Sequence, residues 1–316
     1  MTQQTGDGDG VAVRAEALSK AYGSKPVLSD VSFEVRAGER CCFVGVNGSG
    51  KSTLLELVMG LKVPSGGRLE VLGCGPSSPR LKERRVMLMD RASFPYYAKV
   101  GEIVWLYSGF YKEPRDGAAL LRTFELDAGT YIRHLSKGQR QRLGIMLALL
   151  GSPRLILLDE PTSGLDPQAR AKLWESLGTK LREDPRLTLI FATHDFAEAE
   201  RWADRIGILH RGRLVAMRSP EEHCSASVST RRKLTIAAGP DADPSRYLFE
   251  GVESVARVGG EITLYTDEPE RVLQRVGLNG GTTQIRIESV SVKDAFFKLT
   301  GEVPDGASNP AVQKSW

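Results

Sequence analysis

The chain has 316 residues, of which 41% are hydrophobic and 26% charged, a balance typical of globular proteins. Its formal net charge of +4 is too mild to indicate a nucleic-acid partner. The longest strongly apolar stretch, residues 145–150, is far shorter than the roughly 18 residues that a membrane-spanning helix needs. The length allows one full domain and a smaller second one.

Neither the N-terminal residues nor the cysteine pattern indicates a secreted protein. Residues 1–10 lack the charged start and apolar core of a secretory signal, so we expect a flexible tail there. The four cysteines form no CxxC pair, and Cys41 and Cys42 lie in an apolar, strand-like run. Reduced, buried thiols are therefore expected rather than disulfides or a metal site, which suits a reducing cytosol.

The first two thirds of the chain alternate between strands and helices. Residues 11–44 have the alternation of strands, and residues 92–150 are mostly helical with a break near 109–117. Beyond them, LILLD at 155–159 and LTLIFATHD at 187–195 have the continuous apolar character of buried parallel strands. This order predicts a layered α/β domain over residues 11–224 with a parallel central sheet.

A change of composition at residues 225–232 predicts a linker to a second domain at 233–300. There we expect strands at 233–238, 252–258, 261–266 and 283–288, with helices at 244–249 and 268–276. The order β-α-β-β-α-β favours a small ferredoxin-like α+β domain. A last helix, VKDAFFKL, precedes a polar tail that we expect to be flexible over 301–316.

GVNGSGKST at residues 45–53 matches the P-loop pattern G-x-x-x-x-G-K-[ST], follows an apolar strand and opens a helix. The N–H groups of such a loop curl around phosphates at a helix N-terminus. Lys51 is expected to reach the β- and γ-phosphates, and Ser52 to ligate Mg²⁺. A glycine-rich turn with a chance lysine is the alternative, which the flanking strand and helix disfavour. The predicted nucleotide-binding residues are Gly45, Asn47, Gly48, Ser49, Gly50, Lys51, Ser52 and Thr53.

Two carboxylates, Asp159 and Glu160, follow the buried strand 155–159. A carboxylate at the end of a buried strand is costly unless it meets a cation, so Asp159 is expected to hold Mg²⁺. Glu160 is placed to polarise the attacking water as a general base. A helix-capping pair is the alternative.

LSKGQRQRLGIMLAL at residues 135–149 is a helix-like run without an acid at its start. A helix start that offers the Ser136 hydroxyl and the bare amide of Gly138 is an anion site. LSKGQ resembles the LSGGQ signature of ATP-binding-cassette (ABC) ATPases, and Gln139 completes it. Other motifs follow in that family's order: Tyr22 in SKAYG matches the adenine-stacking A-loop, Asp166 in SGLD the D-loop, and His194 in ATHD the switch histidine.

The resemblance, which spans residues 11–223, implies the cassette fold of a P-loop NTPase: a layered α/β core, an antiparallel β subdomain and a helical subdomain at about 91–150. It also implies a homodimer, arranged head to tail around two ATP. Ser136 and Gly138 would bind the γ-phosphate in trans, His194 would hold the γ-phosphate and the lytic water, and Asp166 would carry communication across the dimer. Lys137 departs from the usual glycine; its side chain can point to solvent while its backbone still presents an amide.

The closing segment IESVSVKDAFFKLTG resembles the end of ABC-2-type (daunorubicin-resistance-like) exporter ATPases, with Asp294, Phe296 and Leu299 carrying the match. That branch implies a peripheral protein on the cytoplasmic face of the cell membrane, bound under a separate integral membrane permease. The alternative is a soluble ABC ATPase that acts as a regulator or scaffold without transport. The second domain would serve dimerisation or regulation.

An aromatic-rich region at about 90–111 is expected to contact the permease, with Tyr96 and Tyr97 as the leading candidates. Ile103, Leu106 and Phe110 share one helical face and are expected to pack inside the helical subdomain.

Asp90 ends the stretch VMLMD, where the family has the Q-loop glutamine; a register slip of one residue would place Met89 there. A carboxylate is a good Mg²⁺ ligand, so we expect Asp90 to be a metal-linked sensor. The alternative is that it points away, capping the next segment or pairing with Arg91 or Arg84.

Overall fold

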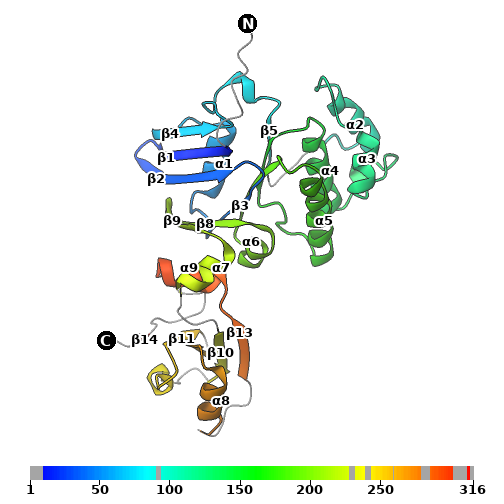
Figure 1. Ribbon diagram of the computed structural model, residues 1–316. Helices are drawn as coiled ribbons and strands as arrows, with labels where there is room; N and C mark the ends of the chain where they lie inside the picture. The colour runs from blue at the N-terminus through cyan, green and yellow to red at the C-terminus, as the bar shows by residue number, and fades with distance from the viewer. Residues whose placement is uncertain are drawn as a thin grey trace. The chain divides into compact units, whose positions relative to one another are not determined.

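A computed structural model describes the chain over residues 10–89, 94–227, 232–238, 243–258, 260–278, 285–301 and 312–313. The chain divides into two compact units, Met1–Met217 and Arg218–Trp316 (Figure 1). No helix among the described residues is long and apolar enough to cross a membrane.

The described residues of the first unit form two sheets. A three-stranded antiparallel sheet has the order β2-β1-β4, and a six-stranded sheet has the order β5-β6-β7-β3-β8-β9. The strands are β1 (Val11–Tyr22), β2 (Lys25–Arg36), β3 (Arg40–Val44), β4 (Gly66–Val71), β5 (Arg85–Leu88), β6 (Leu155–Asp159), β7 (Thr188–Thr193), β8 (Arg205–His210) and β9 (Arg213–Arg218).

The five strands from β5 to β8 in the larger sheet run parallel, as the apolar runs in the sequence predict. All six residues of β7 are buried, and so are the first four of β6. In the register, Val44 pairs with Thr193, and Asp159 pairs with Ala192. The carboxyl ends of β3, β6 and β7 therefore meet at one edge of the sheet, which is where ligands bind in open α/β sheets.

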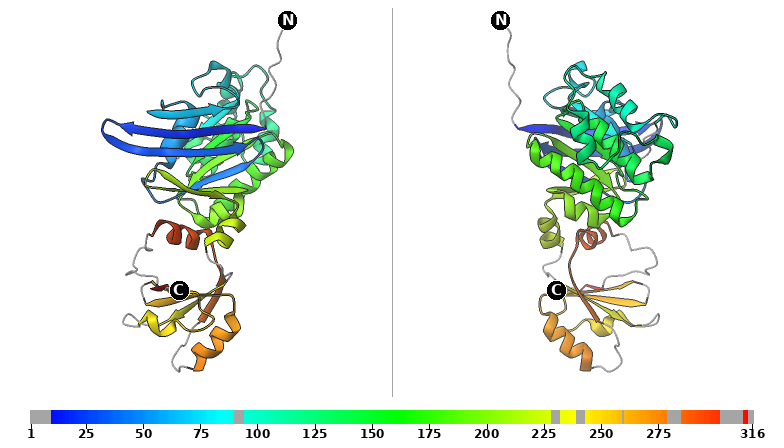
Figure 2. Two further views of the ribbon diagram at one scale, coloured as in Figure 1. Left: turned by 60° about the vertical axis from the view of Figure 1, so that its left-hand side comes forward. Right: turned by 90° about the vertical axis from the view of Figure 1, so that its right-hand side faces the viewer.

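Helices surround this sheet and build a helical subdomain, in agreement with the sequence-based expectation (Figure 2). The break expected near 109–117 is confirmed, since it separates α2 from α3. The helices of the first unit are α1 (Lys51–Met59), α2 (Val100–Ser108), α3 (Gly117–Thr123), α4 (Lys137–Leu149), α5 (Pro167–Glu183) and α6 (Phe196–Trp202).

The apolar face expected for the helix after residue 100 is only partly correct. Ile103 is buried, but Leu106 is 46% exposed and Phe110 is 68% exposed, so neither packs inside the subdomain. The buried face of α2 consists of Val100, Ile103 and Val104 instead. Helix α2 ends at Ser108, so Phe110 lies beyond the helix and does not continue its face.

The second unit has the sheet order β13-β10-β12-β11-β14, with every pair of neighbours antiparallel. The β-α-β-β-α-β order is confirmed, with the 3₁₀ turn Pro244–Tyr247 in the first helical place. A core of residues such as Leu234, Ile262 and Val272 fills the sheet face next to α8. The elements are α7 (Pro220–Ser227), β10 (Arg232–Ala237), β11 (Ser254–Val258), β12 (Glu261–Thr266), α8 (Pro269–Leu278), β13 (Ile285–Ser289), α9 (Val292–Thr300) and β14 (Val312–Gln313).

Helix α7 extends the second unit toward the N-terminus. It begins at Pro220 and contacts α9, so residues 225–227, expected in a linker, are helical. Asp294 explains the position of α9: its carboxylate accepts from Ser291 N at 2.8 Å, from Lys233 Nζ at 3.0 Å and from Tyr265 Oη at 3.2 Å. Burial raises the pKa of Asp294, but the hydrogen bonds from Ser291 and the charge of Lys233 outweigh it, so the pKa is lowered.

Candidate functional site

The P-loop connects the end of β3 to the start of α1 and is shaped by its glycines. Gly50 is the N-cap of α1 at φ 106°, a left-handed conformation that favours glycine. A Cβ at Gly45 would lie 2.2 Å from the carbonyl oxygen of Leu209, so only glycine fits there. Ser49 is buried, and its Oγ has no hydrogen-bond partner among the described residues. Asn47 and Gly48 are exposed at the loop tip, and Ser52 and Thr53 lie in the first turn of α1.

Lys51 folds back over this loop. Its Nζ donates to the carbonyl oxygens of Gly45 at 2.7 Å and Val46 at 3.2 Å, and it lies 3.8 Å from Glu160 Oε1. Burial lowers the pKa of Lys51 below its usual value, while Glu160 and Asp159 oppose this shift. A cation is thus held inside the loop that the sequence predicts to bind phosphate.

Glu160 and His194 face each other at the edge where β6 and β7 end. His194 Nδ1 lies 2.8 Å from Glu160 Oε2, and the backbone N–H of Glu160 donates to Ala192 O at 2.9 Å. Glu160 has φ 47°, a left-handed conformation that is uncommon for a residue with a side chain. The two residues expected to be catalytic are therefore brought together with Lys51. Asp159, half-buried, ends β6 beside them.

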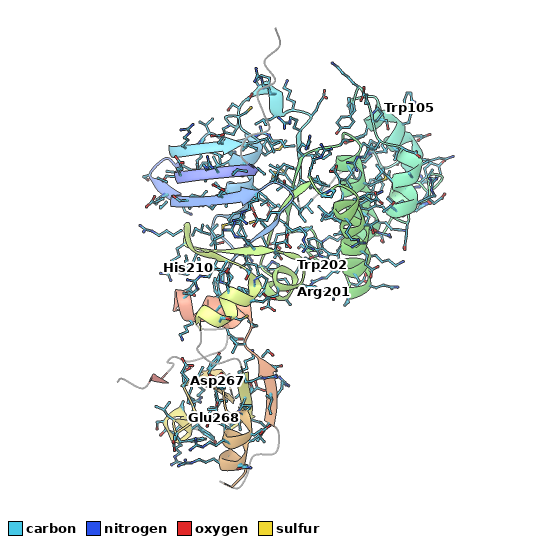
Figure 3. The ribbon with its side chains drawn as sticks, viewed as in Figure 1. Trp105, Arg201, Trp202, His210, Asp267 and Glu268 are labelled. Atoms are coloured by element: carbon cyan, nitrogen blue, oxygen red, sulfur yellow. The ribbon has the colours of Figure 1, made fainter. Side chains whose placement is uncertain are left out.

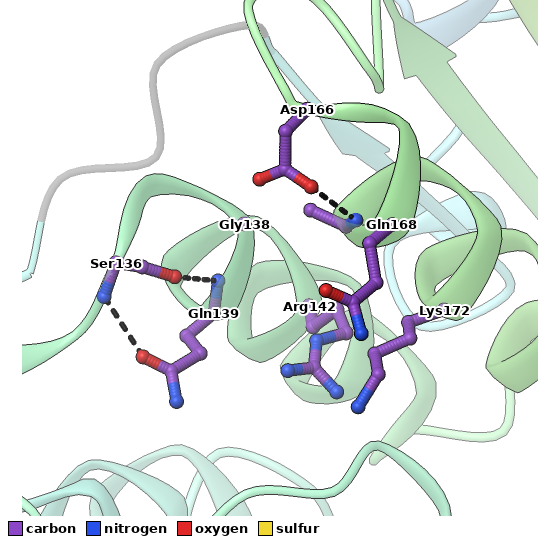
Figure 4. A pocket seen from close by; sticks show the side chains of 8 residues that line it. Ser136, Gly138, Gln139, Arg142, Asp166, Gln168 and Lys172 are labelled. Atoms are coloured by element: carbon purple, nitrogen blue, oxygen red, sulfur yellow. Dashed lines mark hydrogen bonds between the residues drawn. The ribbon is translucent and has the colours of Figure 1, made fainter.

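Ser136, Gly138, Gln139 and Asp166 line one pocket of about 270 Å³ at the N-termini of α4 and α5 (Figure 4). Ser136 Oγ accepts from Gln139 N at 3.1 Å, and Gln139 Oε1 accepts from Ser136 N at 2.8 Å, which forms a capping box. Asp166 caps α5 by accepting from Ala169 N at 2.9 Å. The pocket is polar and is also lined by Arg142, Gln168, Ala169 and Lys172.

Known proteins resemble the chain over almost its whole length. The family model described as "ABC transporter" matches residues 28–163. "Nod factor export ATP-binding protein I" of Rhizobium johnstonii is 31% identical over 95% of this chain and 98% of its own length, and the protein of that name from Rhizobium sp. (strain N33) is 32% identical over 92% and 97%. The chain belongs to the ABC transporter ATPase family.

Solved structures agree with this membership. An "ATP binding subunit of ABC transporter" superposes with a TM-score of 0.60 at 28% identity, covering 68% of this chain and 92% of the solved one. The protein cbiO1 from Clostridium perfringens gives 0.62 at 26% identity, over 68% and 90%. As an ABC ATPase, the protein binds and hydrolyses ATP.

Two further sequence-predicted site residues of this ABC ATPase are Tyr22 and Asp90. Tyr22, at the end of β1, is 44% exposed, with Lys20 Nζ 5.1 Å and Lys62 Nζ 5.9 Å from its ring centroid. Asp90 lies outside the described residues, as does its neighbour Arg91, and Met89 before them is 47% exposed. The assignment of Asp90 as a metal-linked sensor stays a prediction.

Lys137, which replaces a signature glycine in this ABC ATPase, has a defined partner. Its Nζ donates to the carbonyl oxygen of Ser163 in the D-loop. A Cβ at Gly164, which has φ 66°, would lie 2.6 Å from the same Nζ. The side chain therefore ties α4 to the D-loop instead of pointing freely to solvent.

Sequence reasoning missed a buried link beside the Glu160–His194 pair. Glu198, four residues after His194 on α6, is 7% exposed, and its Oε1 accepts from Thr162 Oγ1 at 2.5 Å and Trp174 Nε1 at 2.8 Å. Thr162 follows Glu160 by two residues, so the link joins the segments that carry Glu160 and His194 to α5. Trp174 also stacks on Trp202, labelled in Figure 3, at 5.2 Å between ring centroids. The signal available in the sequence was a threonine two residues after Glu160 and an acid four residues after His194.

Proposed function

We propose that this protein is the ATP-hydrolysing motor subunit of an ABC exporter, which dimerises around two ATP and drives a separate membrane permease. The observation that carries the proposal is the assembly of Lys51, Glu160 and His194 at one sheet edge, with contacts of 3.8 and 2.8 Å. Export is favoured by the names of the relatives, which describe those proteins as Nod factor export subunits.

The P-loop residues would bind the triphosphate. The N–H groups at the start of α1 and the Lys51 ammonium offer the positive charge that phosphate oxygens need. Lys51 would exchange its bonds to Gly45 and Val46 for bonds to the β- and γ-phosphates. Ser49 Oγ is buried and has no partner in the part of the chain that the structure describes, so its hydroxyl would donate to a phosphate oxygen. Tyr22 would stack on the adenine base through its exposed ring face.

Mg²⁺ fits the oxygen donors present at this site. Asp159 and Ser52 would hold the ion, which supplies neutralisation of phosphate charge when bound. Among the described residues no cluster of three or more His, Cys, Asp or Glu is arranged to hold a metal. This suits Mg²⁺, since that ion commonly takes one or two carboxylates and completes its shell with substrate phosphates and water.

Glu160 would act as the general base. Its carboxylate accepts a proton from the attacking water, while His194, held 2.8 Å away, orients the carboxylate and contacts the γ-phosphate. The strained backbone of Glu160 and its N–H bond to Ala192 O fix the direction from which the base approaches. Thus the P-loop residues would bind the phosphates, and Glu160 with His194 would activate the water.

Ser136 and Gly138 would complete the site from the second copy of a head-to-tail dimer. Ser136 Oγ already accepts from Gln139 N, so its hydroxyl proton is left to donate to a γ-phosphate oxygen. The N-terminus of α4 adds positive potential without an opposing acid in its first turn. Asp166, on the wall of the same pocket, would transmit the presence of ATP between the copies.

The permease contact would lie on the exposed apolar residues of the helical subdomain. Trp105 lies on the outer side of α2 (Figure 3) and is 79% exposed, and Tyr97 is 80% exposed. Such aromatic side chains are typical anchors of protein interfaces. We propose that this contact holds the protein peripherally at the cytoplasmic face of the membrane. The other members of the patch are Tyr96, Leu106 and Phe110.

The Glu160→Gln substitution tests the enzymatic part of the proposal. Loss of a general base should lower ATP turnover by about 100-fold or more. The variant should still bind ATP and elute as an ATP-dependent dimer in size-exclusion chromatography. Glu175→Gln, at an exposed position of α5, is the matched control and should keep the parent rate. Turnover by Glu160→Gln at the parent rate would contradict the assignment of the base.

The Trp105→Asp substitution tests the motor role. With a co-expressed hydrophobic permease, the parent should sediment with membranes, and Trp105→Asp should move to the soluble fraction without losing ATPase activity. A parent protein that stays soluble beside its co-encoded membrane protein would instead favour a soluble regulator or scaffold.

A further inference from the structure

The sheet of the second unit has one edge covered by its own chain and one edge open. β11 pairs with β14, whereas β13 has β10 as its one neighbour among the described residues (Figures 1 and 2). Arg286, Glu288 and Ser289 on β13 are exposed, and Ile287 between them is 43% exposed. An open strand edge offers unpaired backbone N–H and C=O groups to another strand.

The residues of β13 form a charge pattern that is complementary to itself. The strand reads Ile285-Arg286-Ile287-Glu288-Ser289. If two copies pair antiparallel with Ile287 opposite Ile287, then Arg286 of each copy lies opposite Glu288 of the other. Residues directly opposite in an antiparallel pair have Cβ atoms about 4.5–5.5 Å apart and share one face, so opposite charges there attract.

We propose that β13 is a homodimerisation edge, at which two copies of this chain join their sheets antiparallel about Ile287. Each copy contributes one Arg286 and one Glu288, so the contact has two ion pairs. Glu288 Oε2 also lies 3.7 Å from Lys233 Nζ, so in the pair it would sit between two cations. The two Ile287 side chains would cover each other on the sheet face that carries the core, since Ile287 pairs with buried Leu234.

Edge protection alone does not account for this arrangement. Charged side chains that protect a sheet edge are typically lysines, whose like charges would repel an identical strand. Here Arg286 and Glu288, of opposite sign, lie one position before and one position after the exposed Ile287. That arrangement attracts an identical antiparallel strand. The strand is short, so the contact is weak by itself. It gains strength where a second contact between the same two copies raises their effective concentration. This reinforcement rests on the proposed ATP-driven dimer, whereas the pairing itself does not.

Disulfide trapping tests the pairing in the full-length protein. Opposite Cα atoms in an antiparallel pair are about 4.5–5.5 Å apart, which suits a disulfide. We expect Ile287→Cys, in a Cys74→Ser/Cys224→Ser background, to form a covalent dimer when treated with diamide, and faster with ATP present. Glu270→Cys, exposed on α8, is the matched control and should cross-link at least about tenfold more slowly because it faces no partner.

Charge reversal then identifies the register. Arg286→Glu or Glu288→Arg should each slow cross-linking of Ile287→Cys about tenfold, because each places like charges opposite each other twice. The double reversal restores both ion pairs and should recover the parent rate. Mixing the two single variants should also recover it, since each then complements the other. The reduced variants should keep their ATPase activity, which serves as the check on folding.

Three results would overturn the proposal: Ile287→Cys that cross-links no faster than Glu270→Cys, single reversals without effect, or a double reversal that fails to restore the rate. The ATP-dependent dimer of Glu160→Gln is measured separately by chromatography. Failure of the β13 pairing is therefore distinguishable from failure of the proposed motor function.

Discussion

The phosphate-binding half and the signature half of the cassette use their polar groups differently. In the first half, charged side chains face one another: Lys51 and His194 contact opposite oxygens of Glu160 at 3.8 and 2.8 Å. In the second half, Ser136 and Asp166 satisfy the first N–H groups of their own helices. The difference suggests a division of roles: the first half is arranged for the chemistry that we propose, while the second offers a helix start without an acid in its first turn as a recognition surface.

The largest effect is expected in the phosphate-binding half, at Lys51. Lys51→Met removes the buried ammonium that the loop holds through Gly45 and Val46, so the affinity for ATP should fall about 100-fold, as for loss of a charge-assisted bond to phosphate. Equilibrium binding of a fluorescent ATP analogue measures this. Lys112→Met, at an exposed position outside both halves, should bind as the parent does. Unchanged affinity of Lys51→Met would remove the contrast between the halves.

A smaller effect is expected at Thr162, whose bond to Glu198 lies beside the Glu160–His194 pair of the phosphate-binding half. Thr162→Val removes the hydroxyl that donates to Glu198 and should loosen α6, and with it His194, relative to Glu160. We expect kcat to fall about tenfold, a fraction of what full general-base catalysis contributes, with KM for ATP unchanged. Steady-state kinetics separate the two constants. Thr162→Ser, which keeps the hydroxyl, should restore kcat, and equal kinetics for Thr162→Val and the parent would refute the supporting role.

The smallest effect is expected in the signature half, at Lys137. Lys137→Gly removes the bond to Ser163 O, an exposed charged hydrogen bond whose net value is modest. In a Glu160→Gln background, the ATP concentration for half-maximal dimerisation should rise about threefold, since the D-loop loses its tie to α4. Analytical ultracentrifugation across an ATP titration measures this, with Lys137→Arg as the variant that keeps the bond. A change of 100-fold would mean that Lys137 itself binds nucleotide.

The sequence predicts the positions of the residues in the phosphate-binding half because each motif there specifies its own local structure. GVNGSGKST carries its own turn, helix start and lysine, and parallel strands necessarily bring Glu160 and His194 to one edge. The β-α-β-β-α-β order of the second unit likewise follows from alternation alone.

Other features depend on contacts between distant segments, which periodicity does not encode. The Glu198–Thr162 bond spans 36 positions, and the Lys137–Ser163 bond spans 26. The exposure of Leu106 and Phe110 was also mispredicted. Helical spacing shows which residues share a face, but not where the helix ends or whether that face is covered.

The dimerisation of the Glu160→Gln variant tests the central claim most directly, because it asks whether the two halves meet across a dimer. We predict that Glu160→Gln elutes as a dimer with ATP, whereas Glu160→Gln/Ser136→Arg binds labelled ATP equally well but elutes as a monomer. An ATP-dependent dimer of undiminished stability in the Ser136→Arg variant would contradict the account.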